Sequence, residues 1–374
     1  MDRRRAIPTG RLQRLQENRD RNLREQYDQY ETLQSKPTHV AVPTGDRCNL
    51  QCIFCTDRRQ PCSDRYTDLS YEQFLRFTEA LENASLIQLY GWGEPFVNPD
   101  YEKIFDHVVE NFAGARLHIS TNGVLLTDRW IGKLLAYGKC LLNVSLNAVT
   151  PQTYMQVTGR DSFDRVVDNL KHLISAKQEH GVDDLVVSLS FVSIKPNIHE
   201  LPRFIELSSE LGINYVILQD LLILEKHHYP LSLGALEAET RRLFVRAAEI
   251  ARERQIYLDS FTHYPVTYFM QDRSQYPEID WPRDCLSVWE QQDEVLFYPQ
   301  PGECYEPWQS FLISQNGAVT TCCRFREVMG NLQEQSFEEI WNGEKYRAYR
   351  RTINTFRPPE ACTWCPVKTG CDIR

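Results

Sequence analysis

Short apolar runs alternate with longer amphipathic segments in this sequence, and no other feature limits the fold as strongly. Six runs rich in Val, Ile and Leu predict strands, at 39–43, 86–91, 116–120, 141–146, 185–192 and 214–218. The helical patterns between them are Tyr71–Leu81, Tyr101–Phe112, Phe163–Ile174 and Leu201–Leu211. Strands that alternate with helices of this length predict βαβ units and an α/β fold with a parallel sheet. The periodicity leaves open whether the units form an open sheet or a partial barrel.

Three cysteines follow the first predicted strand within one short segment, Cys48-Asn49-Leu50-Gln51-Cys52-Ile53-Phe54-Cys55. Three thiolates can hold three irons of a [4Fe–4S] cluster and leave the fourth iron open, whereas a closed electron-transfer cluster takes four thiolates. The spacing therefore indicates a cluster that binds another molecule. The alternative is a zinc site with Cys62 as the fourth ligand, although structural zinc sites are usually assembled from CxxC pairs.

The composition is typical of a globular protein with one large or two modest domains, because 42% of the 374 residues are hydrophobic and 25% are charged. A net charge of -9 gives no basic surface for nucleic acid and opposes attraction to anionic membranes. No apolar stretch approaches the ~20 residues that span a bilayer. Twelve cysteines without a secretory signal indicate a reducing compartment. We expect a cytoplasmic protein with no nucleic-acid partner and no membrane partner.

The cysteine spacing, with the aromatic Phe54 before the last cysteine, resembles the radical S-adenosylmethionine (SAM) enzymes. The second predicted strand ends in Gly91-Trp92-Gly93-Glu94-Pro95, which is similar to the GGEP element of that family, with Trp92 where a glycine is usual. The resemblance implies a partial (β/α)6 barrel with its chemistry at the C-terminal ends of the strands. It also implies that Cys48, Cys52 and Cys55 bind a [4Fe–4S] cluster whose open iron is chelated by SAM.

The same resemblance implies which residues bind SAM. Phe54 would lie near the adenine, and the turn of Gly91, Gly93, Glu94 and Pro95 would hold the methionine ammonium, with Glu94 as its charge-assisted acceptor. Further polar contacts would come from the following strand ends: Asn122 in the pocket, Ser145 and Asn147 to the ribose, Arg160 to the carboxylate and the Leu218 backbone to the adenine. Ser188 and Ser190 share one face of the fifth predicted strand.

The C-terminal cysteines form a second constellation, which resembles the SPASM/twitch extension that wraps auxiliary [4Fe–4S] clusters. The residues predicted as ligands of one such cluster are Cys304, Cys322, Cys362 and Cys365. Zinc is an alternative for a site of four cysteines. Cys323 and Cys371 remain; either could replace a ligand or act as a thiol that returns a hydrogen atom to a substrate radical.

These inferences divide the chain into four parts. They are an N-terminal helical arm (1–37), a radical SAM partial barrel (38–220), a connecting or substrate-facing segment (221–300) and a SPASM/twitch-like auxiliary-cluster domain (301–374).

The resemblance implies an enzyme that reductively cleaves SAM to a 5′-deoxyadenosyl radical, with an electron donor such as flavodoxin or ferredoxin. We expect the radical to abstract hydrogen from a small polar molecule, such as a sugar, a cyclitol or a nucleotide-like compound, in an oxidation, epimerisation or rearrangement. Only 47 residues precede Cys48, fewer than a leader-binding domain of ~80 residues needs. Modification of a ribosomal peptide is the alternative within the family. An iron–sulfur or zinc protein with a structural or electron-carrier role is the alternative outside it.

Overall fold

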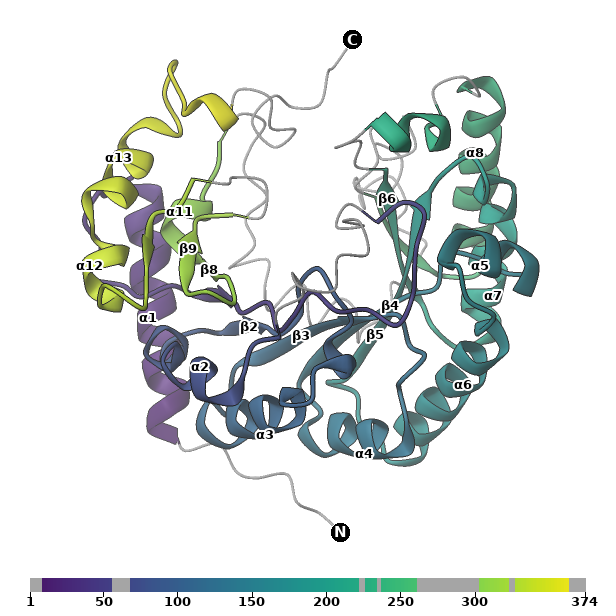
Figure 1. Cartoon of the computed structure of the whole chain (residues 1–374), viewed down its shortest axis with the longest axis horizontal. Coiled ribbons are helices and arrows are strands. Elements are labelled where there is room, and N and C mark those ends of the chain that lie inside the picture. Colours follow the sequence, from purple (N-terminus) through teal and green to yellow (C-terminus); the bar gives the residue numbers. More distant parts are fainter. Residues whose placement is uncertain are drawn as a thin grey trace. The chain divides into compact units, whose positions relative to one another are not determined.

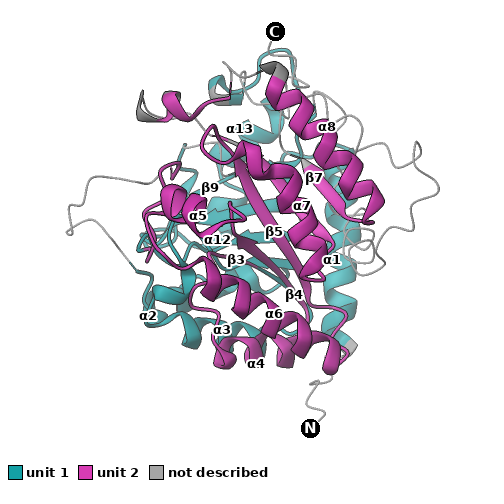
Figure 2. Ribbon diagram, turned by 90° about the vertical axis from the view of Figure 1, so that its right-hand side faces the viewer, with its two compact units in different colours: residues 1–47, 67–118, 291–374 teal, residues 48–66, 119–290 magenta. Residues whose placement is uncertain are grey.

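The computed structural model describes residues 9–55, 68–221, 226–233, 237–260, 303–322 and 327–362. They belong to two compact units (Figure 2). Unit 1 comprises Met1–Arg47, Thr67–His118 and Gln291–Arg374, and unit 2 comprises Cys48–Tyr66 and Ile119–Glu290. Both units are assembled from segments that are distant in sequence. The sequential division into four parts stays a prediction.

Unit 1 contains parallel strands from both ends of the chain. β1 (His39–Ala41) pairs with β2 (Leu86–Gln88), and β2 pairs with the start of β3 (Arg116–Thr121). On its other edge, β1 pairs in parallel with β8 (Ser310–Ile313). β9 (Ala318–Thr320) pairs with β8, and β10 (Gly330–Asn331) pairs with β9, both in the antiparallel direction.

Helices α2 (Tyr71–Leu75) and α3 (Tyr101–Asn111) lie on one side of β2 and β3 in unit 1 (Figure 1). A capping box of Ser70 and Gln73 begins α2. The single helix predicted over 71–81 is divided, because α2 ends at Leu75 and the 3₁₀ helix η2 covers Thr78–Leu81. The Thr78 hydroxyl donates to the Leu75 carbonyl at 2.9 Å, a local bond that competes with helix continuation. A second 3₁₀ helix, η3 (Pro95–Val97), precedes α3.

The N-terminal arm forms helix α1 (Thr9–Tyr27), followed by an irregular segment that packs on the C-terminal helices of unit 1. These helices are α11 (Glu306–Gln309), α12 (Phe337–Trp341), α13 (Glu344–Thr352) and the 3₁₀ helix η8 (Glu360–Cys362). The arm is not a fully solvated helix: Asn22 and Glu25 are buried, and the Glu25 carboxylate accepts the Ser35 N–H at 3.1 Å.

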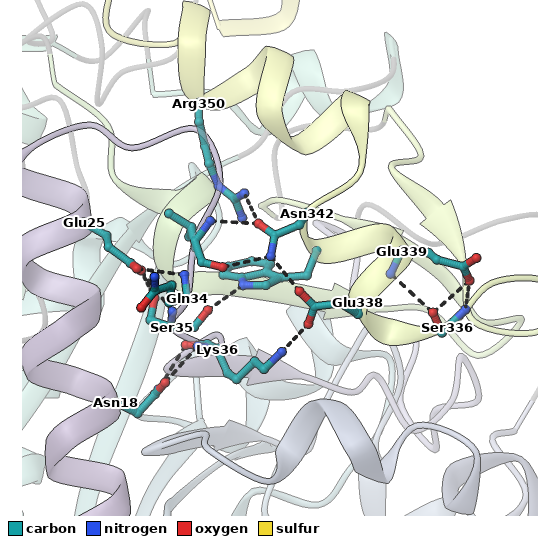
Figure 3. A network of polar contacts seen from close by, with 12 residues as sticks. Asn18, Glu25, Gln34, Ser35, Lys36, Ser336, Glu338, Glu339, Asn342 and Arg350 are labelled. Atoms are coloured by element: carbon teal, nitrogen blue, oxygen red, sulfur yellow. Dashed lines mark hydrogen bonds and ion pairs between the residues drawn. The ribbon is translucent and has the colours of Figure 1, made fainter.

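Three C-terminal side chains donate to backbone carbonyls of this arm: Trp341 to Ser35 at 2.8 Å, Asn342 to Leu33 at 2.9 Å, and Arg350 to Glu31 at 2.9 Å. Figure 3 shows Asn342 and Arg350 of this group. An ion pair between Lys36 and Glu338 lies beside them.

Unit 2 contains the remaining parallel strands. β4 (Cys140–Ser145), β5 (Val186–Ser193) and β6 (Tyr215–Asp220) are paired in that order, and β6 pairs with β7 (Tyr257–Ser260). The helices of this unit are α4 (Asp128–Tyr137), α5 (Pro151–Thr158), α6 (Phe163–Glu179), η4 (Ile198–Glu200), α7 (Leu201–Glu210), η5 (Lys226–Leu231) and α8 (Glu237–Glu253).

All six strands predicted from the sequence are present, and the α/β class is confirmed. β7 was not predicted, because four residues that include an aspartate and a serine give no apolar run. Its register against β6 instead places Tyr257 beside Tyr215, with ring centroids 5.2 Å apart. Within the described part of the chain, no helix is both long enough and apolar enough to cross a membrane.

Candidate active site

The loop of Cys48, Cys52 and Cys55 belongs to unit 2 and is fixed by its backbone. The Gln51 N–H donates to the Thr158 carbonyl at 2.8 Å, and the Ile53 N–H donates to the Val157 carbonyl at 2.9 Å. The loop therefore lies against the last turn of α5. Cys48 is exposed, and Cys52 and Cys55 are half-buried.

Gly159 makes this close approach possible. It ends α5 in the left-handed conformation with φ +71°, and a Cβ added there would lie 3.1 Å from the Gln51 Cβ. A left-handed C-terminal glycine is the usual end of a helix that must turn sharply. Arg160, the residue proposed for the SAM carboxylate, follows directly and is exposed.

Two N–H groups face the Cys48 sulfur within unit 2. The Leu50 backbone N–H lies 3.4 Å from Sγ, and the Asn122 side-chain amide lies 3.8 Å from it. The Asn122 amide also donates to Asn49 Oδ1 at 2.7 Å. Hydrogen bonds to cysteine sulfurs stabilise a thiolate and tune an iron–sulfur cluster, so this donor set fits the predicted cluster.

In the described ranges, no three His, Cys, Asp or Glu side chains are grouped around a single-ion site. A [4Fe–4S] cluster does not require such a group, because each thiolate binds a different iron.

The Gly91–Pro95 turn belongs to unit 1 and contacts the segment that leads to Cys48. The Glu94 backbone N–H donates to the Arg47 carbonyl at 2.8 Å, and Cys48 is the next residue in the chain. A Cβ on Gly93 would lie 2.3 Å from the Arg47 oxygen, so only glycine allows this approach. The Glu94 carboxylate is buried and accepts the Phe96 N–H at 3.3 Å. Trp92, the departure from the family motif, is 53% exposed.

A polar layer crosses β4 and β5 in unit 2, and Asn143 is its centre. The Asn143 amide donates to Ser120 Oγ at 3.0 Å and to Ser190 Oγ at 3.1 Å. Its carbonyl oxygen accepts from Ser188 Oγ at 3.2 Å. Ser188 and Ser190 do share a face, as expected, but Asn143 was not predicted. The signal for it was an asparagine inside the apolar run Cys140-Leu141-Leu142-Asn143-Val144.

Ser145 is the last residue of β4, and Asn147 lies just beyond the end of that strand. The Asn147 backbone has φ +60°, a left-handed conformation that is uncommon for a residue with a side chain. Its side chain donates to Ser145 Oγ at 2.7 Å and accepts the Val192 N–H at 2.8 Å. The buried Asn197 amide donates to the Asn147 carbonyl at 3.0 Å, a contact that sequence reasoning missed.

Leu218 and Phe54 are the other two residues predicted to bind SAM. Leu218 lies inside β6, in register with Phe191 and Ser260. Phe54 is half-buried on the cysteine loop.

Three of the cysteines predicted to bind the auxiliary cluster gather around α13 in unit 1. The Cys304 N–H donates to Asn354 Oδ1 at 2.8 Å, just beyond the end of α13. Burial raises the pKa of Tyr349 on α13, and the neighbouring Cys362 and Cys322 raise it further. Cys323, Cys365 and Cys371 lie outside the described residues.

Two family models match the chain. Residues 42–208 match the Radical SAM superfamily, and residues 304–366 match SPASM, an iron–sulfur cluster-binding domain. These matches support an iron–sulfur rather than a zinc interpretation of both groups of cysteines.

Relatives and solved structures agree with this assignment. A "Tungsten-containing aldehyde ferredoxin oxidoreductase cofactor-modifying protein" from Pyrococcus furiosus is 24% identical over 341 residues, which are 90% of this chain and 89% of that protein. A "Probable GTP 3',8-cyclase" from Saccharolobus islandicus is 33% identical over 208 residues, 55% of this chain and 59% of that protein.

Streptococcus suis SuiB bound to S-adenosylmethionine has the same fold, with a TM-score of 0.62 and 18% identity over 91% of this chain and 73% of SuiB. This likeness confirms the fold class predicted from the sequence. The cofactors are accordingly SAM, the [4Fe–4S] cluster that binds it, and auxiliary iron–sulfur in the C-terminal domain. The chain is therefore an enzyme of the radical SAM superfamily with a C-terminal SPASM domain.

Proposed function

We propose that this enzyme reductively cleaves SAM and uses the resulting 5′-deoxyadenosyl radical to abstract hydrogen from a small polar substrate. The observation that carries the proposal is the bond between the Glu94 N–H and the Arg47 carbonyl, at 2.8 Å. Because Cys48 follows Arg47 in the chain, this backbone bond supports the assignment of Glu94 to a SAM molecule bound at the predicted cluster. The cluster supplies the electron that cleaves SAM when it is bound.

The chain's own residues would bind and orient SAM. We assign the cluster to Cys48, Cys52 and Cys55, and the methionine ammonium to Glu94 in the turn of Gly91, Gly93 and Pro95. Arg160 is exposed beside the cysteine loop, which supports its assignment to the SAM carboxylate. The remaining SAM contacts are assigned to Phe54, Asn122, Ser145, Asn147 and the Leu218 backbone.

For the substrate, we propose a nucleotide-like or cofactor-like molecule. The curated relatives support this class, because one is named as a cofactor-modifying protein and another as a probable GTP cyclase. The polar layer of Ser120, Asn143 and Ser190 in unit 2 would suit a molecule rich in hydrogen-bonding groups. The reaction is an oxidation, an epimerisation or a rearrangement.

A peptide substrate is the second candidate. SuiB, whose fold this chain shares, has been solved bound to its precursor peptide SuiA, with a TM-score of 0.61 and 16% identity over 94% of this chain and 74% of SuiB. Identity this low supports a common fold rather than a common substrate.

One auxiliary [4Fe–4S] cluster is proposed, with Cys304, Cys322, Cys362 and Cys365 as ligands. The gathering of the first three around α13 supports it. A flavodoxin or ferredoxin is proposed as the electron donor, and Cys323 or Cys371 as a hydrogen donor if the reaction is an epimerisation.

The first test is SAM cleavage without substrate. Anaerobically reconstituted and reduced protein should form 5′-deoxyadenosine slowly. Glu94→Ala should weaken SAM binding roughly ten- to a hundred-fold, since a charge-assisted hydrogen bond contributes about 1.5–3 kcal/mol. Glu82→Ala, an exposed carboxylate of the same unit, is the control. Unchanged SAM affinity in the Glu94→Ala protein would disprove the assignment.

The second test distinguishes the substrates. Sugars, cyclitols, nucleotides and short peptides are supplied in turn, and substrate-dependent 5′-deoxyadenosine is measured. We expect only the small polar class to stimulate its formation, and deuterium from the labelled substrate should appear in it. Stimulation by peptides alone would favour the second candidate.

A further inference from the structure

One side of the unit 1 sheet mixes polar side chains with the buried Ala41 and Leu86, whereas the opposite side is apolar. Successive strand residues point to opposite sides, so the parallel register decides which side chains are neighbours. Ala41 is paired with Gln88, and Gln88 is paired with His118. His39 lies two residues before Ala41, so His39, Gln88 and His118 share one side of the sheet.

The other side of the same strands is a packed core. Val40, Ile87 and Leu117 are fully buried there. The polar side differs, because His39, Gln88 and His118 are only half-buried. Closed (β/α) barrels fill their interior with branched apolar side chains, whereas this side presents imidazole and amide groups. A sheet face of this kind suits a ligand rather than a core.

Contacts within unit 1 hold the two imidazoles in place. His39 Nδ1 lies 3.3 Å from Ser310 Oγ on β8, and Ser310 is fully buried. The His118 ring contacts Tyr90 edge-on, with centroids 4.9 Å apart. These contacts orient both rings on the half-buried side of the sheet.

Burial lowers the pKa of His118 to about 4, and the nearby His39 lowers it further. Burial also lowers the pKa of His39, while the charge of Glu306 and the side chain of Gln88 act in the opposite direction. Near pH 7 both rings are then neutral. A neutral imidazole has one nitrogen that accepts a hydrogen bond and one that donates.

We propose that this side of the sheet is a substrate-binding wall, on which His39 and His118 accept hydrogen bonds from hydroxyl or amino groups of a polar substrate. Tyr90 and Gln88 complete the wall with an aromatic edge and an amide. The inference rests on the proposed function, since it names the residues that recognise the small polar molecule. The residues of the wall are different from those assigned to SAM.

The first experiment asks whether the wall is open in the folded protein. Diethyl pyrocarbonate acylates neutral, solvent-reachable imidazoles, and the modified residues are mapped by mass spectrometry on the reconstituted holoenzyme. His172, whose side chain is 54% exposed, is the internal standard. His118 should react, more slowly than His172. Complete protection of His118 while His172 reacts would show a closed core and overturn the proposal.

The second experiment measures recognition. Without a substrate, His118→Gln and His118→Leu should form 5′-deoxyadenosine at the parental rate. With an active member of the panel of sugars, cyclitols and nucleotides, His118→Leu should raise KM roughly three- to tenfold, the loss expected for one neutral hydrogen bond. His118→Gln keeps an acceptor and should recover part of the loss, and His172→Gln should match the parent.

The outcomes separate this proposal from the function it rests on. Absence of 5′-deoxyadenosine in the parent protein would refute the proposed function, and the acylation result would still decide whether the wall is open. Normal cleavage with an unchanged KM in His118→Leu would refute the wall alone.

Discussion

At the scale of single residues, the chemistry depends on polar side chains that support the cysteine loop. Asn122 was predicted as a residue of the SAM pocket, and its amide faces Asn49 and the Cys48 sulfur. Its carbonyl oxygen accepts the Val124 N–H at 3.0 Å, which fixes the amide in this direction. The same asparagine therefore holds the loop and supplies an N–H to a predicted cluster ligand.

Asn122→Ala should lower the reduction potential of the SAM-binding cluster, because an N–H···S bond stabilises the reduced, more negative cluster. The potential is measured by a redox titration followed by electron paramagnetic resonance. Asn111→Ala, at the exposed end of α3, is the control. A potential equal to that of the parent would contradict a role for the Asn122 amide at the cluster.

His118 should make folding stability depend on pH. Its pKa is about 4 in the folded protein against 6.5 for an ordinary histidine, because burial disfavours the charged ring. The unfolded chain therefore binds the proton more readily. The folding stability that depends on a neutral His118 ring is therefore complete above about pH 6.5 and decreases as the pH falls toward 4. At pH 5.5 the loss should be on the order of 1 kcal/mol.

The measurement is the difference in Tm between pH 7.5 and pH 5.5. His118→Gln, which cannot be protonated, should show a smaller difference than the parent, and the exposed His172→Gln should show the parental one. Identical differences in all three proteins would show that His118 is not buried as a neutral ring.

At the scale of elements, two backbone arrangements position the predicted site. The Gly91–Pro95 turn depends on contact with the Asp46–Arg47 backbone. Gly93→Ala would bring a Cβ within 2.3 Å of a carbonyl oxygen that has no room to move. The cost is expected at about 1–3 kcal/mol, with displacement of the turn.

Gly93→Ala should therefore lose most SAM binding, as measured by equilibrium dialysis of the reconstituted protein. Gly132→Ala is a matched control, because nothing lies within 4 Å of the added Cβ and the residue is inside α4. That control should be slightly more stable than the parent, by up to about 1 kcal/mol. Normal SAM binding by Gly93→Ala would show that the turn is not part of the site.

The second arrangement is the attachment of the arm to α13. The Arg350 guanidinium is buried, donates to the Pro307 and Glu31 carbonyls at 2.9 Å each, and lies 4.4 Å from the Trp341 ring centroid. Burial lowers its pKa to about 10, so it stays charged near neutral pH. The helix it fixes is the one around which the auxiliary cysteines gather.

Arg350→Ala should destabilise unit 1 by at least about 2 kcal/mol, because it removes charge-assisted hydrogen bonds to the Pro307 and Glu31 carbonyls and cation–π contacts with Trp341 and Tyr346. Auxiliary iron should be lost before the SAM-binding cluster. Arg347→Ala on the same helix removes only a surface ion pair with Glu344 and should change stability by less than about 1 kcal/mol. Equal loss of iron from both clusters would contradict a specific role of this attachment.

At the scale of the whole molecule, the two groups of cysteines predict two clusters. Anaerobically reconstituted protein should hold about eight irons. Joint replacement of Cys48, Cys52 and Cys55 by Ala should remove about half of them and abolish formation of 5′-deoxyadenosine. Joint replacement of Cys304, Cys322 and Cys362 should remove the other half and spare cleavage of SAM without substrate. Zinc in place of iron in the parent would refute both assignments.

The sequence by itself determined the features that are local. Six strands and the helices α2, α3, α6 and α7 follow from hydrophobic periodicity, and the cysteine triplet and the Gly91–Pro95 turn follow from residue spacing. Such features are fixed by neighbours along the chain, so a single sequence is enough to find them.

Only the tertiary structure decided the contacts between distant segments. It joined β8 to β1, buried one face of α1 under the C-terminal helices and placed Asn143 between Ser120 and Ser190. It also paired β7 with β6 and aligned His39 with His118 across two strands. These contacts depend on register and on packing between residues far apart in sequence, which local periodicity does not encode.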